Sequence, residues 1–350
     1  MRIITRSGPS VTWSIAVYGA AAVVGLLMTI VLISISGAPV GASLVALGQG
    51  AAGSPASIAS SVVKATPLIL TGLATCVTYR AGLWTVGQES QVVAGAAAAW
   101  QMSLWTTGMA PVVVIVLCVL AALAGGAALG ALVAWFRTRF GISEIVSSMM
   151  LNYIVFFALA WLISGPWMAS GGTASYQQTG LLERAYWLPN IVDVGKMHIG
   201  VVLALIVVIW LQVLLKRMPL GYEIRAMGFN ATALSQRGVD KRRLVLTVMV
   251  ISGVIAALAG VGEVFGVSHR LTGDNLSGMG FDGIIIALIG GLSPLGTLVA
   301  GLFFGALHNG SLFMNVITGV PTALVTAIQG VVLILFLIAG AVRRYRIERA

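Results

Sequence analysis

Long apolar runs separated by short polar passages make up most of this sequence. A membrane-spanning helix needs about 20 predominantly apolar residues. Eight runs are long enough: residues 15–36, 60–79, 88–108, 111–136, 144–165, 199–215, 244–268 and 322–342. The pattern predicts an all-α, polytopic membrane protein in which residues 1–350 form a single transmembrane domain.

The basic residues set the expected orientation of these spans. Arg2 and Arg6 precede a first run that is too long for the apolar core of a signal peptide, so we expect an uncleaved first span that starts in the cytoplasm. Alternating sides then places the larger basic clusters in the cytoplasm, where loops carry an excess of Lys and Arg: Arg80, Arg137, Arg139, residues 216–243 and the C-terminal tail. Both termini are therefore expected to be cytoplasmic.

Residues 281–309 need a different arrangement, because the last span must enter from outside to deliver the basic tail. Residues 290–296, with the sequence GGLSPLG, interrupt this segment. They leave apolar stretches of about 11 and 13 residues, each roughly 17–20 Å long as a helix and shorter than the roughly 30 Å hydrocarbon core. We expect a broken hairpin of two short helices, for a total of about ten transmembrane helices.

A second interruption, at residues 80–91, turns the chain between the second and third spans. Irregular backbone at membrane depth survives only where protein or a water-filled cavity covers it. Both interruptions are therefore expected beside a solute pathway. Because they are entered from opposite sides, they suggest an inverted repeat of residues 60–165 against 244–342.

Residues 216–243 form the long polar passage of the second half, KRMPLGYEIRAMGFNATALSQRGVDKRR. Such a basic stretch cannot lie in hydrocarbon, where each central Lys or Arg costs roughly 2.5–3.5 kcal/mol. Asn230 is a candidate N-cap and Gly238 a candidate helix terminator, so a helix of about two turns is expected between them. Projecting into water, this helix would suit docking into a groove of another protein. An ordinary basic loop is the alternative.

Polar residues within the spans are candidates for the solute pathway, because such groups usually face the bundle interior. Asn152 lies near midspan, and its alternative role is a helix-to-helix hydrogen bond. Glu89 and Gln91 open the third span, where Glu89 could simply complement the helix dipole. Glu263 faces either the cavity or headgroup water, and Asp282 opens the first short helix of the hairpin.

Several classes of function are disfavoured by the sequence. It contains no P-loop, no HExxH and no paired-cysteine motif, so no catalytic site, metal site or cofactor is expected. Cys76 and Cys118 both lie in apolar runs and behave as small apolar side chains there. The net charge of +10 follows from membrane topology, and nucleic acid is not expected as a partner.

Four stretches resemble bacterial ABC-importer permeases of the ribose and branched-chain amino acid type, and especially their simple-sugar and nucleoside branch. One of them begins with GFDG at residues 280–283 and is similar to their pattern G-[FY]-x-G-I-A-V-A-L-x-G-x-x-x-P-x-G. The run GYEIRA at residues 221–226 and the residues after it resemble the cytoplasmic coupling loop of those permeases. Residues 80–91 match the pattern R-A-G-L-x-x-[IV]-G-x-E-x-Q, with Thr85 and Ser90 where Asn and Gly are usual. Residues 144–153 resemble the pattern E-[IV]-x-x-x-[ML]-[ML]-x-N-[YF].

The resemblance implies a permease subunit, not an enzyme, that moves a nucleoside or simple sugar across the bacterial inner membrane by alternating access. It implies cytoplasmic ABC ATPase subunits, a second permease subunit that is homologous or identical, an extracytoplasmic substrate-binding protein and surrounding membrane lipid as partners. The coupling loop would engage the ATPase through Tyr222, Glu223, Arg225, Gly228, Asn230, Ala231, Arg237 and Gly238.

Two other transport functions stay open. A branched-chain amino acid permease would carry a zwitterion, which favours charged groups in the pathway. A secondary transporter would work without partners and show a proton or sodium dependence traceable to Glu89, Glu144 or Glu263. The outer segments, residues 37–57 and 165–198, either receive a binding protein or merely connect spans.

Overall fold

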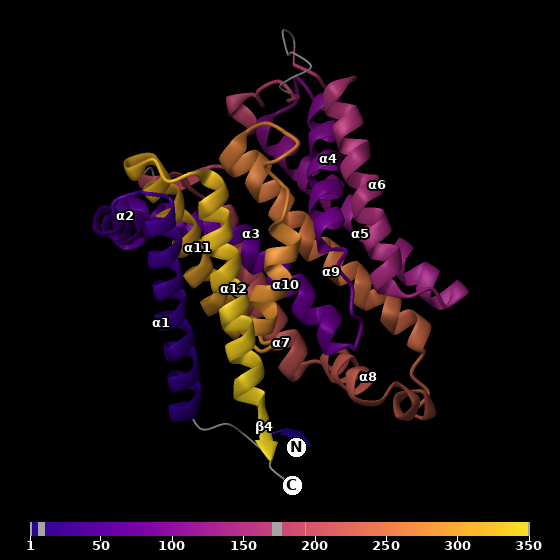
Figure 1. Cartoon of the computed structure of the whole chain (residues 1–350). Coiled ribbons are helices and arrows are strands. Elements are labelled where there is room, and N and C mark those ends of the chain that lie inside the picture. Colours follow the sequence, from indigo (N-terminus) through magenta and orange to yellow (C-terminus); the bar gives the residue numbers. More distant parts are fainter. Residues whose placement is uncertain (1, 6–10, 170–176, 193, 349–350) are drawn as a thin grey trace. The chain divides into compact units, whose positions relative to one another are not determined.

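The computed structural model describes residues 2–5, 11–169, 177–192 and 194–348. These residues are helical almost throughout (Figure 1), which confirms the predicted all-α class. They divide into a terminal unit, within residues 1–65 and 302–350, and a central unit, within residues 66–301. The boundaries fall inside α3 (Pro55–Arg80) and α11 (Pro294–Thr318), so each of these helices contributes to both units.

The terminal unit adds to parts of α3 and α11 three further helices: α1 (Val11–Ile35), α2 (Val40–Ala52) and α12 (Thr322–Arg344). α1 packs along α12, where the rings of Tyr18 and Phe336 stack with centroids 6.1 Å apart. Strands β1 (Arg2–Thr5) and β4 (Tyr345–Glu348) pair antiparallel, so the two ends of the chain lie together (Figure 1). This pairing agrees with the expectation that both termini share one side of the membrane. Their location in the cytoplasm stays a prediction.

The central unit holds the other helices: α4 (Gln88–Trp105), α5 (Pro111–Phe140), α6 (Glu144–Ser164), α7 (Gly200–Arg217), α8 (Pro219–Gln236), α9 (Lys241–Glu263) and α10 (Met279–Ile289). Short elements also occur: 3₁₀ turns Arg184–Tyr186 and Val194–Lys196, strands β2 (Asn190–Val192) and β3 (Met197–His198), and the π-turn Val264–Ser268. Helices α4, α5 and α9 pack closely, and a Cβ on Gly126 or Gly130 of α5 would collide with carbonyl oxygens of α9. Small residues permit this approach of helix backbones.

Eight helices among the described residues are long and apolar enough to cross a membrane. The set differs from the eight predicted runs in two helices: α11 is a member although no full span was expected there, and α4 is not a member although residues 88–108 were expected to span. Its first turn, with the sequence QESQ, is strongly polar and lowers the mean hydropathy of the helix.

The expected hairpin of two short helices is only half right. α10 has 11 residues and is short, as predicted, and an irregular turn separates it from α11. α11 has 25 residues and is long enough to cross the membrane, so the expected second short helix is wrong. The helix continues past Asn309 because this polar side chain is satisfied: its Nδ2 donates to the carbonyl oxygens of Gly50 at 2.7 Å and Ser57 at 3.2 Å.

Candidate functional site

An irregular turn of residues 81–87 links α3 to α4. Gly82 adopts a φ of 74°, which turns the backbone as α3 ends. Farther along, the Gly87 amide donates to the Thr85 hydroxyl (3.1 Å), and the Ser90 hydroxyl donates to the Gly87 carbonyl (2.9 Å). Thr85 and Ser90, where the sequence departs from the family pattern, thus satisfy backbone groups of this turn.

Three side chains of α6 hold the turn in place, and we call them the α6 clamp. Glu144, Ser148 and Asn152 follow one another at intervals of four residues, so they project from nearly one side of the helix. Oε1 of Glu144 accepts a hydrogen bond from Trp84 N (3.1 Å), and Oγ of Ser148 accepts one from Val86 N (3.2 Å). Nδ2 of Asn152 donates to Val86 O (2.9 Å). The clamp supplies partners that an irregular backbone lacks.

Asn152 therefore has both of its amide atoms engaged, because its Oδ1 also accepts from Ser90 N at 3.1 Å. This arrangement is the hydrogen-bonding alternative to a pathway role. Glu144 is doubly engaged as well, since its second oxygen forms an ion pair with Arg137 at the end of α5. The clamp thus joins α5, α6 and the turn.

Glu89 joins the start of α4 to the start of α10. Its Oε1 accepts from Gly278 N at 2.5 Å and its Oε2 accepts from Gly280 N at 2.7 Å. The first amides of a helix have no partner within the helix and carry partial positive charge, so a carboxylate is well placed there. Gly280 also packs so closely on the backbone of Gln88 and Glu89 that a Cβ would not fit. We call this meeting of two helix N-termini the helix junction.

Gln88 is the residue of the helix junction that sequence reasoning missed. Its side chain is fully buried, and within the described residues neither Oε1 nor Nε2 has a hydrogen-bond partner. An unpaired buried polar group costs about 1–3 kcal/mol, so such groups need an explanation. A polar ligand or water could satisfy this amide. The sequence feature that could have identified Gln88 as a candidate is its position beside Glu89, at the start of the predicted third span.

The other predicted pathway residues are only partly gathered at the junction. Gln91 is buried and its Oε1 accepts from the Ser252 hydroxyl at 3.5 Å, which links α4 to α9. Asp282 lies in the first turn of α10 and is partly buried. Glu263 is buried at the end of α9. It lies three residues beyond Gly260, whose Cα packs on Val92, so the structure places Glu263 away from the first turn of α4.

The predicted coupling segment is helical, but it is longer than expected. Asn230 interrupts α8 with φ −156° and ψ 95°, which leaves helical segments at residues 219–229 and 231–236. Asn230 caps the second segment as predicted, because its Oδ1 accepts from Thr232 N at 3.0 Å. Gly238 follows with a φ of 81°, suited to a helix terminator. The first segment was missed and is the larger of the two.

The first segment of α8 has a packed side and an open side. Gly221 lies directly against the backbone of α7, and Ile224 and Met227 are buried. On the open side Phe229 is 91% exposed and Tyr222 is 50% exposed. The other predicted coupling residues also lie in or next to α8: Glu223, Arg225 and Ala231 are partly buried, and the side chain of Arg237 is exposed and donates to the Tyr222 hydroxyl at 3.1 Å.

Arg80 connects α8 with both irregular turns. Gly228 of α8 packs against the Arg80 carbonyl oxygen, so closely that a Cβ would collide with it. The Arg80 Nε donates to the carbonyl oxygen of Leu292, in the turn between α10 and α11, at 2.5 Å. Leu292 has a φ of 55°, which is unusual for a residue with a side chain. A movement of α8 toward α3 would therefore press directly on the backbone at the end of α3.

Two histidines, His198 and His269, lie near the C-terminal end of α9. His198 is 1% exposed, and its Nδ1 accepts from Gly200 N at 3.1 Å. Burial, and to a smaller extent the neighbouring His269, lower the pKa of His198 to about 4. Burial and then the charge of Lys196 lower the pKa of His269, whose ring stacks on Trp187 at 3.6 Å. His198 is therefore neutral at pH 7.

The apolar helices and the two irregular turns indicate a bundle of membrane-spanning helices, and α8 has an open side. Comparison with known proteins identifies the family to which the chain belongs. A family model described as "Branched-chain amino acid transport system / permease component" matches residues 57–337. The chain belongs to this permease family. With its eight candidate spans, it is a multi-pass inner-membrane transport component. Membership implies ATPase and substrate-binding partner proteins.

Curated relatives of this permease carry more specific names. A glucose ABC transporter permease of Haloferax volcanii is 32% identical over 82% of this chain and 77% of its own length. A guanosine ABC transporter permease of Bacillus subtilis is 29% identical over 92% and 93%. A nucleoside ABC transporter permease of Lactococcus lactis is 30% identical over 81% and 79%. No solved structure matches the chain significantly.

Proposed function

We propose that this permease imports a nucleoside or a simple sugar by alternating access, powered by ATP hydrolysis on separate cytoplasmic ABC ATPase subunits. The observation that carries the proposal is the two-sided first segment of α8. Its open side presents Phe229 and Tyr222, while Gly228 touches the end of α3. A helix of this kind can receive force from a partner and pass it into the bundle.

The exposed aromatic side chains suit a docking surface. Figure 1 shows α8 at the end of the central unit where α7 ends and α9 begins. Aromatic side chains and arginine are enriched at the centres of protein interfaces, and Phe229, Tyr222 and Arg237 supply these types. The ATPase would present a groove that accepts Phe229. A second permease subunit, identical or homologous, would present a second α8 to a second ATPase.

The route from α8 to the helix junction consists of direct contacts. Gly228 meets Arg80, Arg80 binds the turn after α10, and the α6 clamp holds the turn before α4. The two turns lie next to α4 and α10, whose first turns meet at Glu89. A shift of α8 would therefore move both broken elements, which favours opening or closing at their junction.

The solute is proposed from the relatives and from the chemistry of the junction. Relatives named as nucleoside, guanosine and glucose permeases support a neutral, polar solute. Gln88 supplies a buried amide that can both donate and accept, as hydroxyl groups and nucleobases require. We propose Gln88 as the solute contact, with Glu89 and Asn152 holding the backbone around it, and Gln91 and Asp282 beside it.

The contacts of two buried carboxylates argue against the alternative of a secondary transporter driven by a proton gradient. A proton carrier needs a carboxylate that is free to gain and lose a proton. Both oxygens of Glu89 accept backbone hydrogen bonds, and both oxygens of Glu144 are engaged. The oxygens of these two carboxylates are thus already engaged in holding backbone and Arg137, which supports structural roles for them and an external energy source.

The test is ATP hydrolysis by the complex of permease, ATPase and substrate-binding protein in lipid nanodiscs. We expect a binding protein loaded with nucleoside or sugar to stimulate the ATPase, and Arg225→Glu, on α8, to abolish the stimulation while the permease still inserts. Stimulation by leucine instead would identify a branched-chain amino acid permease. Full stimulation in Arg225→Glu would remove α8 from the coupling route.

A further inference from the structure

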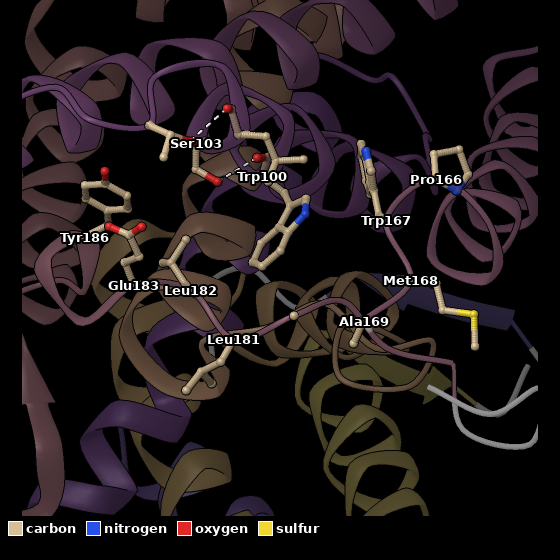
Figure 2. A pocket seen from close by; sticks show the side chains of 13 residues that line it. Trp100, Ser103, Pro166, Trp167, Met168, Ala169, Leu181, Leu182, Glu183 and Tyr186 are labelled. Atoms are coloured by element: carbon tan, nitrogen blue, oxygen red, sulfur yellow. Dashed lines mark hydrogen bonds between the residues drawn. The ribbon is translucent and has the colours of Figure 1, made fainter. Parts of the chain in front are cut away.

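A cavity lies in the central unit, toward the C-terminal end of α4 and away from the helix junction. Its volume is about 420 Å³, within the range of roughly 300–1,000 Å³ that is typical of small-molecule sites. Figure 2 shows the side chains that line it. They come from the last turns of α4, the segment after α6 and the segment before α7: Trp100, Ser103, Leu104, Thr107, Pro166, Trp167, Met168, Ala169, Gly180, Leu181, Leu182, Glu183 and Tyr186.

The walls of this cavity are aromatic and held in place. Trp100, Trp167, Leu181 and Leu182 all line the cavity (Figure 2). Trp100 is 4% exposed, so it is fixed by packing and has almost no free ring face, whereas Trp167 is only partly buried. The Trp167 Nε1 donates to Oε1 of Gln101 at 3.0 Å, which orients its ring. Fixed indole faces favour a flat ring, because stacking needs no ordering of the walls.

The polar groups of the cavity accept hydrogen bonds more than they donate them. Ser103 donates its hydroxyl proton to Trp100 O at 2.7 Å, and Thr107 donates to Leu104 O at 2.9 Å, which leaves their oxygens as acceptors. Glu183 adds a carboxylate. A ligand with hydroxyl and amino donors fits this set, whereas a phosphate would be repelled by Glu183.

From these features we infer that the cavity binds a nucleoside, with its base against the Trp167 indole and its hydroxyl groups toward Glu183. The inference rests on the proposed import function and narrows the solute from nucleoside or sugar to nucleoside. A simple sugar would use the acceptors and can pack its C–H face on an indole, but a flat base covers more of the Trp167 ring, which favours the nucleoside. Trp100, which lines the cavity, lies 12 residues after Gln88 on α4, a distance of roughly 18 Å at 1.5 Å per residue. The cavity would thus receive the solute before it reaches the junction.

The experiment is equilibrium dialysis of the purified permease–ATPase complex, without binding protein, against radiolabelled adenosine, uridine, ribose, glucose and uridine monophosphate. We expect saturable binding of adenosine and uridine, and weaker or no binding of the other three. Trp167→Leu should weaken nucleoside binding about tenfold or more, since a stacked base contributes that much in comparable sites. Glu183→Gln should weaken it while leaving the shape of the cavity intact.

Trp105→Leu is the matched control, because it makes the same change at a tryptophan that ends α4, is 71% exposed and is not among the cavity-lining residues. Its nucleoside affinity should equal that of the wild type. Unchanged affinity in both Trp167→Leu and Glu183→Gln, or binding of glucose or ribose with no binding of nucleosides, would overturn the inference. The proposed function fails separately, if the complete wild-type transporter takes up neither nucleoside nor sugar with ATP.

Discussion

Gly228→Ala tests the contact between α8 and the end of α3 with the smallest possible change. A Cβ at this position would overlap the Arg80 carbonyl oxygen and lie 3.4 Å from the carbonyl carbon of Ala81. Both obstacles are backbone atoms, which cannot rotate away as a side chain could. Extra volume in a packed site typically costs about 1–3 kcal/mol. The first segment of α8 must therefore move away from α3 or bear that strain.

The expected effect is a loss of coupling. If the strained arrangement is the one that passes force to Arg80, a cost of 1–3 kcal/mol lowers its population roughly 5- to 150-fold. ATP-driven uptake into proteoliposomes should fall by about that factor, while ATP hydrolysis becomes less dependent on solute. Uptake and hydrolysis are measured on the same vesicles, together with the thermal unfolding temperature of the permease.

Gly48→Ala provides the control. Gly48 is an exposed glycine of α2, and a Cβ there meets nothing within 4 Å. Replacing it should leave uptake unchanged and stabilise the helix by up to about 1 kcal/mol. The reasoning is refuted if Gly228→Ala transports at the wild-type rate per folded molecule, even with a lower unfolding temperature, because the contact would then be structural only.

Three further predictions concern other parts of the chain. Asn152→Leu removes two hydrogen bonds from the turn before α4 and should lower the free energy of unfolding by about 1 kcal/mol, at roughly 0.6 kcal/mol per bond in membranes; an unchanged denaturation midpoint would argue against the clamp. In Phe229→Cys the introduced thiol should react with a maleimide, and bound ATPase should protect it from labelling. The native Cys76 and Cys118 are buried and should stay unmodified. Equal labelling with and without ATPase would contradict docking at α8. His198 has a pKa of about 4 in the folded state and roughly 6.5 in the unfolded chain. The unfolded chain therefore binds the proton first as the pH drops, and the free energy of unfolding should fall by up to roughly 3 kcal/mol between pH 6.5 and 4. Thermal unfolding of His198→Gln should show a smaller decrease over this pH range, and an identical decrease would exclude His198 as the cause.

Local signals explain what the sequence predicted well. The apolar runs locate most of the spans because the bilayer imposes their length and composition. Asn230 and Gly238 were recognised as the ends of a short helix because capping depends on adjacent backbone alone. The break before α11 was likewise visible in its glycines and proline.

Contacts between distant segments explain what was missed. The first segment of α8 was not predicted, and its Gly221 and Gly228 are needed where backbone meets backbone. α11 continues through Asn309 because α2 and α3 supply its partners. The four-residue spacing of the α6 clamp was present in the sequence, but nothing in it identified residues 81–87 as the partner. Gln88 became a candidate only through its buried surroundings.

The central claim is that force applied to α8 by an ATPase drives this bundle. It is tested most directly by uptake of radiolabelled nucleoside and glucose into proteoliposomes that contain the permease with or without its ATPase, with ATP on the α8 side and the substrate-binding protein on the opposite side throughout. The account predicts uptake only when ATPase and ATP are both present, with no dependence on a proton or sodium gradient. Uptake by the permease alone, driven by either gradient, would contradict it.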